Sequence, residues 1–210
     1  MGLVAKANLS PQERAEFEVL ESMGEDIEGC LMLRFECGWT ALQIALEMRD
    51  DPSIIHGLAA VNADMNAVMP IGTSPLVFAL MNTKIKSARA LIACGANVND
   101  RDSPLLYAVT AEDEETIKTL IERGANVNDG GRCGMTPLHA ACQIQGGGRE
   151  KIIRMLIEAG ADRTLRNASG ETAADLFPSL PSILSDIEAA SLIKKYGDGA
   201  NRSGRKGGAL

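Results

Sequence analysis

The side chains that could carry out chemistry in this sequence are few and scattered. There are two histidines, His56 and His139, and neither stands beside a cysteine in the sequence. The five cysteines are irregularly spaced and form no CxxC motif: Cys30, Cys37, Cys94, Cys133 and Cys142. Because no pair has a spacing usual for metal ligands, we expect no metal site. The odd number of cysteines indicates reduced thiols, as in cytosolic proteins.

A cluster of four acids, Glu112 to Glu115, is the next candidate for chemistry. It could supply paired carboxylates for catalysis or for calcium. The simpler interpretation is a solvated turn that places acids in the first turn of a helix, where the helix dipole favours them. The three glycines at 146–148 lack the Walker spacing and the Lys-Ser/Thr that follows it. We therefore predict no catalytic residue, no cofactor and no enzymatic activity.

Composition and charge exclude several classes of partner. The net charge of −7 argues against a general nucleic-acid binder and against adhesion to anionic membranes. No apolar run approaches the length of a membrane span, and the N-terminus carries no apolar region of signal-peptide length. These features predict a cytoplasmic protein whose partner is neither a nucleic acid nor a membrane.

The elements that must position these residues repeat along the chain. One landmark is a Thr or Ser followed by a short apolar segment, and its copies lie 34, 29, 33 and 36 residues apart, at Thr40, Ser74, Ser103, Thr136 and Thr172. A second landmark keeps nearly the same phase, at Asn62-Ala63-Asp64, Gly95-Ala96-Asn97, Gly124-Ala125-Asn126 and Gly160-Ala161-Asp162. Two landmarks in phase indicate a structural repeat.

Apolar residues before each closing turn have helical spacing. Ile117, Leu120 and Ile121 are one example of the i, i+3, i+4 pattern that places side chains on one helix face. The glycine that follows in three copies suits the left-handed residue that ends a helix, and Asn62 is the next most tolerant type.

These residues resemble the ankyrin repeat, a turn and two helices that open with TPLH and close with G-A-D/N. Thr136-Pro137-Leu138-His139-x-Ala141 is a full match, and the likeness covers about residues 35–177. The resemblance implies an all-α solenoid of about five repeats, in which finger loops and first helices form a concave face that binds proteins. It also implies that His139 links neighbouring repeats by hydrogen bonds.

The flanking segments complete the predicted organisation. We expect residues 1–9 to be disordered, 10–34 to form an N-terminal helical cap that starts at Ser10, and 178–196 to form a capping helix that starts at Ser182. Residues 197–210 are Gly-rich and basic, which predicts a disordered tail.

Two copies depart from the regular length. The connection between the second and third copies is four residues short, which predicts a truncated finger. The fourth copy carries three extra residues, which we place in the loop at 145–149 between its helices.

Positions of the concave face that vary in such repeats give the candidate partner-binding residues. They are Trp39, Met48, Ile71, Thr73, Met81, Asn82, Arg132, Met135, Gln143 and Ile144. The apolar ones among them would form a continuous exposed stripe, with Trp39 as an anchor for a protein partner. The alternative is that N-terminal segments fold over Trp39 and bury it.

The predicted function is a monomeric, non-catalytic protein-interaction module. Alternatives that use the same surface are a host-directed secreted effector, a regulatory subunit and a self-assembling structural protein. An enzyme would need a site outside the repeats, where about 34 residues precede and about 33 follow.

Overall fold

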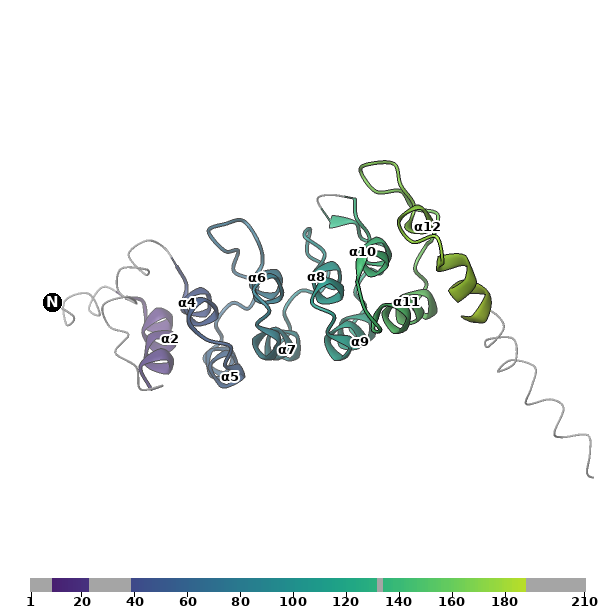
Figure 1. Cartoon of the computed structure of the whole chain (residues 1–210). Coiled ribbons are helices and arrows are strands. Elements are labelled where there is room, and N and C mark those ends of the chain that lie inside the picture. The colour runs from purple at the N-terminus through teal and green to yellow at the C-terminus, as the bar shows by residue number, and fades with distance from the viewer. Residues whose placement is uncertain (1–8, 23–38, 132–133, 188–210) are drawn as a thin grey trace, which may run out of the picture.

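The computed structural model describes residues 9–22, 39–131 and 134–187. Most of these residues form paired helices that are stacked side by side (Figure 1). Each pair has a first helix, a connection and a second helix. The pairs are α4 (Ala41–Met48) with α5 (Pro52–Ala60), α6 (Pro75–Met81) with α7 (Ile85–Ala93), α8 (Pro104–Thr110) with α9 (Glu114–Glu122), and α10 (Pro137–Gln143) with α11 (Arg149–Glu158). The predicted helical solenoid is confirmed.

The first helices start where the repeated Thr or Ser predicts. The hydroxyls of Thr40, Ser74 and Thr136 each accept a hydrogen bond from the backbone N–H three residues on, at 3.3, 3.3 and 3.4 Å. Such caps satisfy a helical N–H that has no partner inside the helix, and each stabilises the fold by about 1 kcal/mol. The sequence landmark is therefore a helix start.

Ser103 holds the same place before α8 but does not cap it. Its backbone is left-handed, with φ of +52°, and its hydroxyl donates to the carbonyl of Asp129 at 3.1 Å instead. The preceding connection runs over 94–103, whereas the others run over 61–74, 123–136 and 159–172. The predicted truncated finger is confirmed, and Figure 1 shows the short loop above α8. The tighter path forces Ser103 out of the extended backbone that a cap requires.

The second helices end in the left-handed conformation that the closing turn predicts. Gly95, Gly124, Gly160 and Asn62 have φ of +88°, +82°, +92° and +60°. The following N–H then reaches back into the helix, as from Ala125 to the carbonyl of Leu120 at 2.9 Å. These turns direct the chain from the second-helix row into the next finger.

Equivalent leucines form a ladder through the core. Each first helix and each second helix contributes one leucine that is at most 1% exposed: Leu42, Leu76, Leu105 and Leu138, and Leu58, Leu91, Leu120 and Leu156. Full burial of a leucine contributes about 2 kcal/mol. Because each unit is sealed by its neighbours, the concave face is held on a rigid support.

The N-terminal end of the array is covered by α2 (Pro11–Glu21), which packs on α4 and α5. Ser10 and Glu13 form the predicted capping box: Ser10 N–H donates to Glu13 at 2.7 Å, and Ser10 Oγ accepts from Glu13 N–H at 3.2 Å. Phe17 and Leu20 are buried. The rest of the predicted N-terminal cap, residues 23–34, and residues 1–8 of the segment predicted to be disordered lie outside the described residues.

At the C-terminal end, α12 (Ala173–Leu176) is followed by a helix whose described part covers 180–187. The predicted start at Ser182 is wrong, because the helix already begins at residue 180 and Pro181 lies in its first turn, where proline is tolerated. Leu180, Ile183 and Leu184 are buried as expected of a cap. The rest of the helix and the tail lie outside the described residues.

Candidate functional site

His139 is a structural residue. It is 1% exposed, its Nδ1 lies 2.7 Å from Thr136 Oγ1, and its Nε2 lies 3.0 Å from the carbonyl oxygen of Glu171. Glu171 belongs to the finger before α12, so the imidazole joins α10 to the next unit. The implied link between neighbouring repeats is confirmed, and both ring nitrogens are engaged in it.

The structure brings the other histidine to a cysteine that lies 38 residues away in the sequence. Cys94 Sγ lies 3.4 Å from His56 Nδ1, between α7 and α5. Burial raises the pKa of the Cys94 thiol, so it stays protonated and its contact with His56 is a weak hydrogen bond. Burial also raises the pKa of Cys142 to about 11. Within the described ranges, no group of three or more potential metal ligands exists.

The cluster of acids clamps two neighbouring repeats together. Asp113 caps α9 by accepting from Thr116 N–H at 3.1 Å, and both of its carboxylate oxygens accept from Arg89 Nη2 on α7, at 2.7 and 2.9 Å. Arg89 also binds Glu115, and its Nε donates to Thr116 Oγ1 at 3.1 Å. Burial opposes ionisation of Asp113, but the hydrogen bonds from Arg89 and Thr116 outweigh it and lower its pKa. The predicted role in the first turn of a helix is confirmed.

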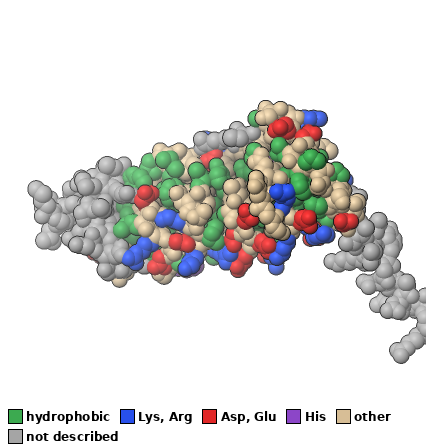
Figure 2. All heavy atoms as spheres, in the orientation of Figure 1, with side chains coloured by type: hydrophobic (Ala, Val, Ile, Leu, Met, Phe, Trp, Pro, Cys, Tyr) green, Lys and Arg blue, Asp and Glu red, His purple; other side chains and the backbone are tan. Residues whose placement is uncertain are grey.

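Exposed apolar side chains gather at one part of the finger and first-helix face. Met48 and Met81, the last residues of the neighbouring helices α4 and α6, are 39% and 48% exposed. Ile71, in the finger between α5 and α6, is 60% exposed, and Val68 in the same finger is 67% exposed. Figure 2 shows hydrophobic side chains over this part of the array and charged ones along the second-helix edge. Sequence reasoning missed Val68, although its place near the finger tip was a usable signal.

The other predicted binding residues do not extend this patch into a continuous stripe. Asn82 and Gln143 are exposed, while the buried Thr73 hydroxyl has no hydrogen-bond partner among described residues. Trp39 and Met135 are half-buried and pack against the core. Arg132 lies outside the described residues.

Ile144 is the clear correction to the predicted stripe. It is 7% exposed and belongs to the core, because the backbone turns at the end of α10 and directs this side chain inward. Among the described residues, the exposed large hydrophobic side chains are therefore limited to α4, α6 and the finger between α5 and α6.

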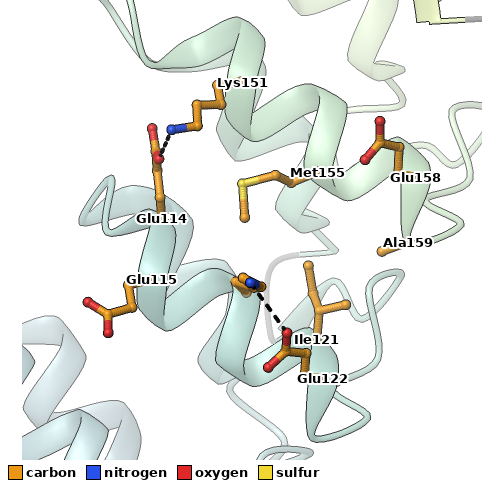
Figure 3. Close-up of a pocket in the computed structure, with 9 residues that line it drawn as sticks. Glu114, Glu115, Ile121, Glu122, Lys151, Met155, Glu158 and Ala159 are labelled. Atoms are coloured by element: carbon orange, nitrogen blue, oxygen red, sulfur yellow. Dashed lines mark ion pairs between the residues drawn. The ribbon is translucent and has the colours of Figure 1, made fainter. Parts of the chain in front are cut away.

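A second surface feature lies on the opposite row of helices. A groove of about 630 Å³ separates α9 from α11, and Figure 3 shows Ile121, Met155 and Ala159 among the charged residues that line it. Lys151 binds Glu114 across it, and Lys118 Nζ lies 3.7 Å from Glu122 Oε1 along α9. Sequence reasoning did not find this groove.

The sequence did contain a signal for this groove, namely the three extra residues of the fourth copy. The connection between α10 and α11 has five residues, 144–148, whereas the corresponding connections of the other pairs have three. The third extra residue lengthens α11 to ten residues. The prediction that all three lie in the loop is therefore wrong by one residue.

No helix within the described ranges combines the length and apolar character needed to cross a bilayer.

Comparison with known proteins agrees with the repeat architecture. A family model described as ankyrin repeats (3 copies) matches residues 42–131 and 100–167. Ankyrin repeat and SOCS box protein 11 of Danio rerio is 56% identical over 41 residues. That match covers 20% of this chain and 13% of the relative, so the chain matches only a small part of that protein. Since the family model covers more than half of the chain, the protein belongs to the ankyrin repeat family.

Proposed function

We propose that this chain is a non-catalytic protein-interaction module that holds a protein partner against the finger and first-helix face around α4 and α6. Ankyrin repeats are in general protein-interaction modules. The observation that carries the proposal is the patch formed by Met48, Val68, Ile71 and Met81, the exposed large hydrophobic side chains of the described residues. Exposed apolar patches mark interfaces, and methionine is enriched in them.

The energetics of the patch suit a partner that buries these side chains together. Each large apolar side chain moved from water into an interface contributes about 1–2 kcal/mol. The leucine ladder behind α4 and α6 keeps the patch in place, so binding loses little entropy in ordering the backbone. Trp39 is half-buried and packs on the core, so its substitution should act on the fold as well as on any contact with the partner.

The proposal includes the setting in which the module acts. Cys94 and Cys142 are free thiols, which suits a reducing compartment, and we place the protein in the cytoplasm. The acidic chain acts as a monomer on a protein partner, not on a nucleic acid or a membrane.

Affinity capture from the native cells, followed by mass spectrometry, tests which face binds. Wild type, the double variant Ile71→Asp/Met81→Asp and the control Ala93→Asp are compared. Ala93 is the exposed last residue of α7, on the second-helix row, so the control adds a carboxylate away from the patch. The expected result is a partner recovered with wild type and control and lost with the double variant. Equal recovery with all three proteins would refute the assignment of this face.

A further inference from the structure

The groove between α9 and α11 is a break in an otherwise packed row of second helices. The earlier neighbours pack on one another, α5 on α7 and α7 on α9, whereas α9 and α11 make at most a marginal contact. The five-residue connection with three glycines gives α11 room to lie further from α9 than a three-residue connection would.

The charged side chains give a second reason why α9 and α11 do not pack closely on each other. When the buried leucines of the second helices are aligned, Lys118 on α9 takes the place that Arg89 has on α7. The acids that receive Arg89 are Asp113 and Glu115, and their places on α11 are taken by Arg149 and Lys151. Lys118 therefore has no acid at the equivalent places on α11 and pairs with Glu122 on its own helix.

The floor and the rim of the groove have different chemistry. Ile121 and Met155 are half-buried: one side of each packs against the core, and the other lines the groove. The rim has four carboxylates, from Glu114, Glu115, Glu122 and Glu158, against the ammonium groups of Lys118 and Lys151. Both ammonium groups are paired, Glu115 binds Arg89 of α7, and Glu158 makes no ion pair with a described residue. The rim therefore keeps one unpaired carboxylate, that of Glu158, next to the apolar floor, and Figure 3 shows Glu158 beside Ala159.

We propose that this groove is a second protein-docking site, and that its occupant is a short helix of a partner protein that presents apolar side chains flanked by lysine or arginine. The walls are helices of nine and ten residues, so the groove is about 15 Å long, which matches two to three helical turns. A helix laid between two helices buries its apolar ridge between them. A flanking cation meets Glu158, the rim carboxylate that has no ion-pair partner among the described residues.

This site is separate from the finger and first-helix patch, so the two proposals stand or fall independently. The patch lies on α4, α6 and the finger between α5 and α6, whereas the groove uses only second helices near the other end of the array. One chain could thus hold two partner segments at once.

Binding of defined peptides to the full chain tests the proposal. The probe is a fluorescein-labelled helical peptide of about twelve residues with leucines along one face and lysines on both sides, and its matched control carries glutamates in place of the lysines. Fluorescence anisotropy should show that the lysine peptide binds wild type at least tenfold more tightly than the glutamate peptide. Ala159→Trp fills the groove and should weaken the lysine peptide at least tenfold. Glu158→Lys should weaken it about threefold to tenfold.

Two controls keep the result specific. Ile71→Asp alters the first patch and should leave peptide affinity unchanged, and Glu18→Lys makes the same charge change as Glu158→Lys on the exposed side of α2. Glu158 is exposed, so Glu158→Lys remains informative if Ala159→Trp fails to fold.

Several outcomes would overturn the proposal. These are no binding of the lysine peptide, equal binding to wild type and Ala159→Trp, or equal affinity for both peptides. Sedimentation velocity adds one more: a dimer that Ala159→Trp dissociates would assign the groove to a second copy of the chain.

Discussion

The helix α9 lies between two other second helices, α7 and α11, and it packs against α7 but is separated from α11 by a groove. Toward α7 it offers Asp113, Glu115 and Thr116, which Arg89 joins into one hydrogen-bonded cluster. Toward α11 it presents Glu114, which binds Lys151 at the groove's edge, and Lys118, which finds no acid at the equivalent place. The first junction is sealed, and the second is a groove.

The difference teaches that each interface of a repeat array is specified separately. Repeats contact only their neighbours, so the stability of the array is close to a sum of units and interfaces. Here the packed and the open junction differ at the places of Arg89, Asp113 and Glu115 and by two residues of the connection between helices. Function can arise at such a place without any change to the core.

The largest expected effect comes from opening the sealed junction. Arg89→Ala removes a partly buried guanidinium that is 36% exposed and leaves Asp113, 19% exposed, without its cation. Hydrogen bonds to charged groups contribute about 1.5–3 kcal/mol, so we expect the free energy of unfolding to fall by about 2 kcal/mol. Urea denaturation followed by circular dichroism measures it. A fall below about 0.5 kcal/mol would show that the cluster does not hold α7 to α9.

The pH dependence of the same junction gives the second prediction. The folded-state pKa of Asp113 is lowered from the usual 3.8, so its ionised form stabilises the fold above pH 3.8, and this contribution is lost as pH falls through the lowered value. Asp113→Asn keeps an acceptor for the helix cap but loses the charge, at a cost of about 1 kcal/mol near pH 7. The stability difference between wild type and Asp113→Asn should be constant above about pH 5 and shrink below pH 3.8. A constant difference down to pH 3 contradicts the assignment.

The third prediction narrows the open junction. Deleting Gly146 and Gly147 gives the connection between α10 and α11 the three residues of the other pairs. It should bring α11 toward α9 and slow oxidation of Met155 by hydrogen peroxide about threefold, because the thioether loses solvent access. Peptide mass spectrometry reads the rate, with the exposed Met81 as an internal reference. An unchanged ratio of Met155 to Met81 would mean that loop length does not set the width of the groove.

The smallest effect is expected at the wall of the groove. Lys118→Ala removes an exposed i, i+4 pair with Glu122, whose side chains are 70% and 62% exposed. Exposed pairs of this kind contribute about 0.3 kcal/mol, so the free energy of unfolding should barely change. A loss comparable to that of Arg89→Ala would remove the contrast between the two junctions.

The sequence determined the repeat architecture because its signals are local. The caps at Thr40, Ser74 and Thr136 and the left-handed glycine or asparagine at each closing turn depend on residues within one helical turn. The truncated finger could also be predicted from the sequence, because the connection between the second and third copies is four residues shorter than the others. The start of the last helix was misplaced by two residues, since Pro181 is equally compatible with a helix start and with the residue before one.

Only the tertiary structure decided which side chains meet across repeats and which stay in water. It buries Ile144, exposes Val68, brings Cys94 to His56 and Arg89 to Asp113, and leaves Met155 beside an open groove. These outcomes depend on the distance and rotation between units some 30 residues apart in the chain. Local periodicity specifies the faces of each helix, but it does not encode how closely two helices approach, because that distance depends on residues of both helices and on the chain that connects them.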